Sequence, residues 1–315
     1  TCPTFRTRRD AEITKGIYRR VPVLINERTG VNPWAITFKQ GLFNMTGDSG
    51  LFRTREQLTV DGYVVSGNRY EKPGSTYLPL YEAKMIHQFD HRFATYTSTE
   101  DIRDTSTDEH RDAGFEPQAR YWVNATDTEE RLQRQRADGT LEWRWDEPWL
   151  LAFRDITNST NERTAIFSFI PRTAVGNNLP LCLLEGIELM QVMALAAAAS
   201  SFAFDFVARQ AVGGTHMNFF IVKQLPVPTP DAFTDADLAF IGPRVEELVA
   251  TSERMREALG AEAVHAWDAE RRWRLRVELD AFFFHRYGLP RDDVAYVMDT
   301  FPIIERRELA EHGSY

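Results

Sequence analysis

The most apolar stretch of this chain, Leu179 to Phe206, limits the folds that the sequence can adopt. Three acidic residues interrupt it, namely Glu185, Glu188 and Asp205. No run therefore reaches the roughly 18 uninterrupted apolar residues that favour a membrane-spanning helix. We expect a buried core helix from about Leu183 to Gln210, and we expect no membrane partner.

The segment behind this helix, "ARQAVGGTHMNFFIVKQLPVP" (Ala208–Pro228), changes character three times and stops at Pro226 and Pro228. It crosses Gly213 and Gly214, and the apolar run "NFFIVKQL" that follows favours a strand. Glycine tolerates positive φ and lets the backbone approach another surface, such as a phosphate. Thr215 and His216 would then stand at the same edge as hydrogen-bonding groups. A plain helix-to-strand turn explains the two glycines equally well.

Size and composition predict a cytosolic protein with a real core. The 315 residues, 43% of them hydrophobic, suffice for two compact units or one large one. The two cysteines, Cys2 and Cys182, form no CxxC pair, which is typical of a reducing compartment. No apolar signal-peptide core precedes residue 20. The missing initiator methionine fits either its removal before Thr1 or excision from a longer protein.

Charge is unevenly distributed along the chain. Residues 97–147 hold 14 acidic and 7 basic residues, which leaves 32 acidic and 30 basic residues elsewhere. The net charge of -9 argues against sequence-blind binding of nucleic acid over the whole surface. A local acidic segment in a nearly neutral chain remains compatible with DNA binding. Because residues 97–147 are also poorly periodic, we expect a long insertion or mobile loop there.

Periodicity and capping signals predict an α+β fold, in which a mixed or antiparallel sheet has flanking helices and a helical C-terminal appendix. Helices are expected over residues 7–21, from Thr234 to Leu259 with a bend at Pro243, over 268–287, and in a short piece after Pro290. Strands with a hairpin are expected within 63–92. "EPWLLAFRDIT" and "RTAIFSFIP" suggest two paired strands.

Catalytic motifs are absent from the sequence: it has no GxGxxG, GxxxxGK[ST], HExxH or GxSxG. In "HQFDH", His87, Asp90 and His91 could approach one metal ion, but hydrogen-bonded structural histidines give the same pattern more often. "VNPWAI" invites comparison with the Asn-Pro-Pro-Tyr loop of adenine methyltransferases. Its second proline is missing and no glycine-rich turn precedes it, so a turn with a packed Trp34 is favoured.

Two further stretches carry polar or basic residues. "RTAVGNN" (Arg172–Asn178) could read guanine and adenine edges through its arginine and asparagines, although a turn alone explains it equally well. "RRWRLR" (Arg271–Arg276) alternates with apolar residues at helical spacing, which favours a structural role.

Six segments share one family pattern: "RDAEITKGIYRRVPVLI", "NPWAITFKQGLFNMTGDSGLFRT", "YLPLYEAKMIHQFDHRFATY", "WLLAFRDITNSTNERTAIFSFIPRTAVGNNLP", "SFAFDFVARQAVGGTHMNFFIVKQLPVP" and "RRWRLRVELDAFFFHRYGLPRDDVAYVMDTFPI". Together they resemble the C-terminal half of large adenine-specific DNA methyltransferases. These are the type IIG restriction-modification enzymes and the related methylases of bacterial phage-defence systems such as DISARM. The segments occur in family order and cover nearly the whole chain except the acidic insertion.

The resemblance implies a division of labour within a longer parent protein. In that family the motifs that bind the methyl donor, S-adenosylmethionine, lie upstream, and this sequence lacks them. The resemblance therefore implies that this chain holds no cofactor, no metal ion and no catalytic residue. Residues 1–60 would be connecting helices, 61–230 a target-recognition domain with the insertion 97–147, and 231–315 a helical tail.

The resemblance also implies partners and contact residues. The partners would be double-stranded DNA, the methylase core of the same polypeptide and, in defence systems, further subunits. Expected contacts to phosphates or bases are Lys84, Arg92, Arg154, Arg163, Arg172, Asn177, Asn178, Gly213, Gly214, Thr215 and His216. Two alternatives stay open: a docking module that uses Trp273 and Phe282–Phe284 without contacting DNA, and a metal hydrolase built on His87, Asp90 and His91.

Overall fold

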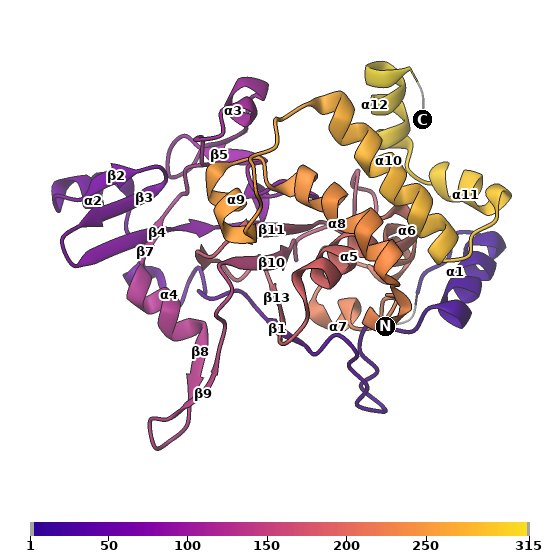
Figure 1. Ribbon diagram of the computed structural model, residues 1–315, viewed down its shortest axis with the longest axis horizontal. Coiled ribbons are helices and arrows are strands. Elements are labelled where there is room, and N and C mark those ends of the chain that lie inside the picture. The colour runs from indigo at the N-terminus through magenta and orange to yellow at the C-terminus, as the bar shows by residue number, and fades with distance from the viewer. Residues whose placement is uncertain (1–2, 314–315) are drawn as a thin grey trace.

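The computed structural model describes residues 3–313, and it has an α+β fold (Figure 1). Its centre is a four-stranded antiparallel sheet in the order β1-β13-β10-β11. The strand bounds are β1 Ile36–Lys39, β10 Trp149–Phe153, β11 Phe167–Pro171 and β13 Leu181–Leu184.

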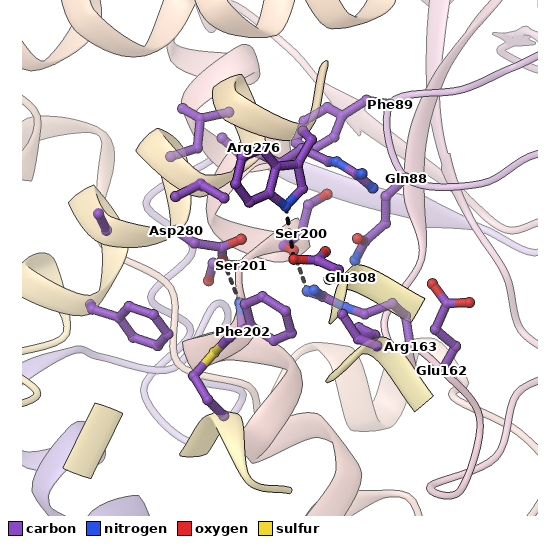
Figure 2. A pocket seen from close by; sticks show the side chains of 18 of the residues that line it. Gln88, Phe89, Glu162, Arg163, Ser200, Ser201, Phe202, Arg276, Asp280 and Glu308 are labelled. Carbon is purple, nitrogen blue, oxygen red and sulfur yellow. Dashed lines mark hydrogen bonds between the residues drawn. The ribbon is translucent and has the colours of Figure 1, made fainter. Parts of the chain in front are cut away.

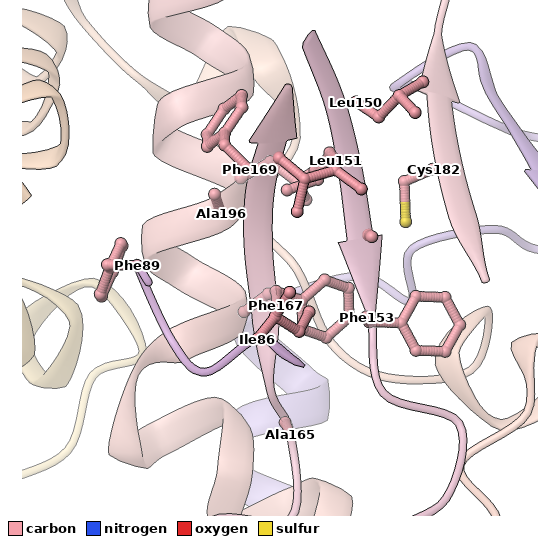
Figure 3. Packing of buried hydrophobic residues seen from close by; sticks show 14 of the residues in the cluster. Ile86, Phe89, Leu150, Leu151, Phe153, Ala165, Phe167, Phe169, Cys182 and Ala196 are labelled. Atoms are coloured by element: carbon pink, nitrogen blue, oxygen red, sulfur yellow. The ribbon is translucent and has the colours of Figure 1, made fainter. Parts of the chain in front are cut away.

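Three of these strands, "WLLAF", "FSFIP" and "LCLL", are buried at every position. Such uninterrupted burial is typical of strands that are covered on both faces. Leu151 lies opposite Phe169 on one side and opposite Cys182 on the other, and Ala196 of the helix α5 (Leu189–Ser200) lies beside this layer (Figure 3). The predicted pairing of β10 with β11 is confirmed.

A second sheet of five strands has the order β12-β4-β3-β2, with β7 also paired to β4. Its strands are β2 Val64–Ser66, β3 Arg69–Lys72, β4 Ser75–Tyr81, β7 Trp122–Asn124 and β12 Ala174–Val175. Gly67 and Gly74 adopt positive φ in the turns between β2, β3 and β4. The expected strands and hairpin are confirmed, and the structure has a second hairpin beside it. The parallel pairing of β12 with β4 makes this sheet mixed.

The acidic segment is structured, so the expectation of a mobile loop is wrong. Besides β7, it contains β6 Ile102–Asp104, α3 Thr107–Arg111, α4 Ala125–Arg131, β8 Gln133–Gln135 and β9 Leu141–Arg144. Strand β6 pairs with β5, Ala94–Tyr96, which lies just before the segment. These elements are too short for periodicity to show. Local caps and large buried anchors stabilise them instead: Ser106 and Glu109 form a capping box, and buried Trp122 donates to the Asn68 carbonyl.

The expected long helix is divided into three elements. Leu181–Leu184 is strand β13, α5 follows, and α6 (Phe202–Ala211) begins after a break at Ser201. The Ser201 hydroxyl accepts a hydrogen bond from the Phe204 amide, and this N-cap starts the second helix. None of the helices between residues 3 and 313 is by itself long and apolar enough to cross a membrane; α5 and α6 pass that test only as a pair, and they are bent by 59°.

The expected strand "NFFIVKQL" is wrong, because residues Phe219–Val222 form the short helix α7. The Asn218 side chain accepts a hydrogen bond from the Ile221 amide and so caps this turn. Phe220 is 54% exposed, as a helix allows and a buried strand would not.

The C-terminal region is helical, as predicted. Its helices are α8 Asp235–Val249, α9 Glu253–Leu259, α10 Ala269–Arg286, α11 Arg291–Met298 and α12 Pro302–His312. The N-terminal part of the chain contributes two more helices, α1 Arg8–Arg20 and α2 Arg55–Val60. Pro243 lies inside α8, and the expected 234–259 helix is interrupted at residues 250–252, where Ser252 caps α9. Helix α1 lies against α11 through Arg9, which donates to the Asp292 carbonyl (Figure 1).

One apolar core includes Ile17, Leu151 and Phe283, so all three expected regions contribute to it. Their boundaries at residues 60 and 230 stay a prediction.

Buried Asp205 and half-buried Asp280 have different partners. Asp205 of α6 accepts from Arg163 Nε at 2.7 Å and from the amides of Thr164 and Ala165, so it joins α6 to the start of β11. Asp280 of α10 accepts from the Phe202 amide at 2.8 Å, and burial raises the pKa of its carboxyl to about 6.

Replacing Asp205 with alanine leaves the buried Arg163 cation without its counter-charge. We expect D205A to lower the free energy of unfolding by about 3–5 kcal/mol, measured by urea denaturation. D108A, which removes the exposed ion pair with Arg111, is the control and should cost no more than about 1 kcal/mol. Equal losses in the two variants would contradict the assigned role of Asp205.

Asp280 should make stability fall as pH rises. Its folded pKa, about 6, lies above the ordinary value of 3.8, so the native state holds this proton more tightly than the unfolded state does. The stabilisation is complete below about pH 4 and is lost as pH rises to about 6. D280N should therefore gain about 1–3 kcal/mol relative to the native chain between pH 4 and pH 7. A pH-independent difference between the two unfolding curves would refute this.

Candidate nucleic-acid interface

Polar groups from separate segments meet where strand β10 leaves the core. The Asp155 amide donates to the Asn178 carbonyl at 3.2 Å, and the Asp155 carbonyl accepts from the Met217 amide at 2.8 Å. The end of β10 is thereby fixed between the loop after β12 and the segment after α6. We name the group around it the polar edge: Gln40, Lys84, Asp155, Asn177, Asn178, Thr215 and His216.

The Asp155 carboxylate organises the polar edge. Its Oδ2 lies 3.4 Å from Gln40 Nε2 and 3.3 Å from His216 Nδ1. The Asp155 side chain is 12% exposed whereas that of His216 is 56% exposed, so the carboxylate forms a floor under an accessible ring. Within the described part of the chain, Asp155 Oδ1 is buried without a hydrogen-bond partner. Asp155 thus retains unused acceptor capacity.

Asn177 and Asn178 are fixed by backbone donors. Asn177 Oδ1 accepts from the Met45 amide at 3.1 Å, and Asn178 Oδ1 accepts from the Ala83 amide at 3.2 Å. Because a backbone N–H can only donate, both side-chain oxygens must face the protein. The Nδ2 donors, which have no hydrogen-bond partner among residues 3–313, are left for another molecule.

Lys84 and Thr215 complete the polar edge, and Gly213 and Gly214 precede Thr215 in the chain. Lys84 follows Ala83 in the short 3-10 helix Ala83–Met85 and is exposed. The Thr215 carbonyl accepts from the Thr157 amide at 3.0 Å. Gly213 and Gly214 are exposed, and a Cβ on either would meet nothing within 4 Å. Neither adopts positive φ, so the expected conformational need for glycine is absent at these two positions.

Arg154 and Arg172 have protein partners. Arg154 Nε donates to the Ile86 carbonyl at 2.9 Å, and burial lowers its pKa to about 10. The pairing of Trp149 with Pro171 puts Arg172 at the other end of the β10–β11 ladder from Asp155. There Arg172 pairs with Glu129 and donates to the Trp145 carbonyl. The structure therefore does not bring Arg172 to the polar edge.

Arg92 and Arg163 lie in the interior, which corrects their expected place on a DNA-facing surface. Arg92 is fully buried, and its guanidinium donates to the carbonyls of His110, Asp112, Phe115 and Thr251. Arg163 is committed to Asp205. A buried arginine that binds carbonyls and an exposed one that binds phosphate both interrupt apolar sequence, so the pattern alone could not separate them.

The side chains of "HQFDH" have separate partners. His87 packs its ring against Phe93, Asp90 lies 3.1 Å from His110 Nε2, and His91 faces Glu116 at 3.8 Å. Burial lowers the pKa of His87 to about 3. Over residues 3–313, no group of three or more His, Cys, Asp or Glu side chains is arranged to hold a metal ion.

The turn in "VNPWAI" is structural. Asn32 Oδ1 accepts from the Ile36 amide at 3.1 Å, and buried Trp34 donates its indole N–H to the Pro228 carbonyl. The predicted turn with a packed tryptophan is confirmed.

Sequence reasoning missed a positive group beside the projecting β8–β9 hairpin (Figure 1). Lys39 donates to the Arg131 carbonyl, and burial, followed by the charges of Arg131 and Arg134, lowers the pKa of Lys39. Arg131 and Arg134 belong to the acidic segment, residues 97–147. The net negative charge of that segment gave no sign of a local positive group. Gln40 and Asp155 were also missed, since they are 115 residues apart and carry no local motif.

Comparisons with known proteins find little. No family model matches the chain, and no curated protein matches it. Among solved structures, a type IIL restriction-modification enzyme, MmeI, in complex with DNA is similar over 85% of this chain, with 9% identity and a TM-score of 0.33. The matched part is 35% of that enzyme's chain, so this chain spans about a third of its length.

Gly41 provides a test of how the polar edge is built. Its φ is +64°, and a Cβ there would come within 2.2 Å of the Gly176 carbonyl oxygen and 2.9 Å of Asn177 Cα. G41A should therefore cost about 1–3 kcal/mol more in unfolding free energy than G30A. Gly30 has the same backbone region (φ +72°) but open space around it. Urea denaturation of both variants measures the difference, and equal costs would refute the close approach.

Proposed function

We propose that this chain is the DNA-sequence-recognition part of an adenine-specific DNA methyltransferase or restriction-modification enzyme. Two supports are independent of each other: the ordered sequence resemblance and the polar edge. The parent would transfer a methyl group from S-adenosylmethionine to an adenine flipped out of the duplex. Donor binding and transfer belong to a methylase core outside these residues, and the whole would work in the cytoplasm, where defence-system subunits are further partners.

The observation that carries the proposal is the fixed orientation of Asn177 and Asn178. Their outward Nδ2 donors match the acceptor atoms that purines present in the major groove, N7 of both bases and O6 of guanine. Side chains that are fixed before binding lose little conformational entropy when they pair with a base.

Phosphate contacts need separate cations, and two groups supply them. Lys84 stands exposed at the polar edge, and Arg134 is exposed on the β8–β9 hairpin near Lys39. Arg131 beside them is paired with Asp48. Phosphate contacts position a protein on the duplex without reading sequence, whereas base-edge contacts specify. A net charge of -9 does not oppose such binding, because screening confines each charge to about 8–10 Å at ordinary salt.

Most of the aromatic side chains named in the docking alternative contact other residues of this chain. Phe283 and Phe284 are buried in this chain's own core. Trp273 donates its indole N–H to Glu308 of α12 and stacks on His312. Half-buried Phe282 stacks on Phe240, so these contacts within the chain favour the DNA-recognition proposal over docking through the same side chains.

Selection from a random duplex library tests DNA recognition by the 315-residue chain. We expect one enriched sequence and an affinity that falls steeply between 50 and 200 mM salt, because counterions are released on binding (about one per phosphate contact). K84A should weaken every duplex alike and reduce the salt slope by about one. K15A removes an exposed lysine of α1 and is the control.

Asparagine-to-aspartate changes separate base reading from general affinity. N177D and N178D keep the oxygen that binds the backbone amide but replace the outward donor by an acceptor. Each should cost about 1–3 kcal/mol for the preferred base and change the enriched sequence at one position. N161D adds the same charge at an exposed loop position and should leave the sequence unchanged. Binding that ignores salt, or that enriches no sequence, would overturn the proposal.

A further inference from the structure

A cavity of about 310 Å³ lies between the start of α6 and the helices α10 and α12 (Figure 2). Its walls are mainly apolar, with Ala197, Phe202, Leu279, Phe284 and Ile304 among them. The volume is at the lower end of those of small-molecule sites, which are typically about 300–1,000 Å³ and lined by hydrophobic side chains around a few polar groups. None of the polar-edge residues lines it.

Two donors face this cavity without a protein partner. Arg276 of α10 makes no hydrogen bond or ion pair with any residue from 3 to 313, and its Nε is buried. Burial, followed by the charge of Arg307, lowers the pKa of Arg276. Ser200 at the end of α5 is 4% exposed, and its hydroxyl has no partner in the described chain. A buried guanidinium Nε and a buried hydroxyl are normally hydrogen-bonded, so both indicate an absent acceptor.

The other charged groups around the cavity are already engaged. Arg163 pairs with Asp205, and Arg307 pairs with Glu162. Of the carboxylates, Asp280 accepts from the Phe202 amide and Glu308 accepts from the Trp273 indole N–H (Figure 2). Among the polar groups that line the cavity, the ones without a hydrogen-bond partner are therefore donors, the Arg276 Nε–H and the Ser200 hydroxyl.

We propose that this cavity binds a small, largely apolar molecule that carries one carboxylate. The carboxylate would accept from the Arg276 guanidinium and the Ser200 hydroxyl, and the apolar body would lie against Phe202, Phe284 and Leu279. A guanidinium offers a planar pair of donors that fits a carboxylate. This site does not depend on the proposed DNA function.

Three probes of one shape and different charge test the chemistry of the site. They are 3-phenylpropionate, 3-phenylpropan-1-ol and 3-phenylpropylamine, titrated into the 315-residue chain by calorimetry at pH 7.5. We expect the anion to bind at least about tenfold more tightly than the alcohol, because a hydrogen bond to a charged group is the stronger one. We expect the amine, a cation at this pH, to bind most weakly. An order in which the alcohol or the amine binds best would overturn the proposal.

Variants then locate the bound anion. R276Q should weaken 3-phenylpropionate at least about tenfold and leave the alcohol within about twofold. R274Q is the matched control, since Arg274 is on the same helix but is exposed and paired with Glu270. S200A removes only the hydroxyl oxygen and should weaken the binding of 3-phenylpropionate several-fold. It replaces R276Q as the test variant if R276Q does not fold. Unchanged anion affinity in folded R276Q or S200A, or no binding of any probe, would refute the site.

Discussion

The candidate interface depends on the hydrogen bonds that fix Asp155 at the end of the buried strand β10. Two main-chain bonds join this residue to Asn178 and Met217, which belong to different parts of the chain. Because β10 is buried along its whole length, its end cannot move without disturbing the central sheet. The carboxylate then places Gln40 and His216. A rigid strand therefore positions side chains that come from loops, which is how loop residues acquire a defined geometry.

Three arginines of the described chain, Arg92, Arg163 and Arg272, are buried. Arg92 donates to carbonyls from the acidic segment and from Thr251, so it joins that segment to the C-terminal helices. Arg272 is buried too, and it donates to the carbonyls of Leu248 and Phe89. A guanidinium has five donors in a fixed plane and can satisfy several carbonyls that lack a secondary-structure partner. The number of arginines is consequently a poor measure of a nucleic-acid-binding surface here.

The sequence predicted those elements whose signals are local. Thr7 with Asp10 and Thr234 with Asp237 are capping boxes as expected, and α10 ends before Gly288 as expected. Prediction failed where distant contacts decide: "LCLL" is a strand because β1 and β10 pair with it, and its apolar composition fits a helix equally well. For the candidate interface, the pattern identified Asn177, Asn178 and Thr215–His216. It could not identify Gln40 or Asp155, whose role arises only from long-range proximity.

Unmet hydrogen-bond capacity is present at both candidate sites. At the polar edge, backbone amides occupy the oxygens of Asn177 and Asn178, so the remaining donors are forced outward. In the cavity, Arg276 and Ser200 have donors for which the described chain provides no acceptor. Arg92 and Arg163 look equally functional in the sequence, yet their guanidinium groups donate to carbonyl and carboxylate oxygens of the protein. Since an unsatisfied buried donor is costly, its persistence points to a binding partner more strongly than residue type does.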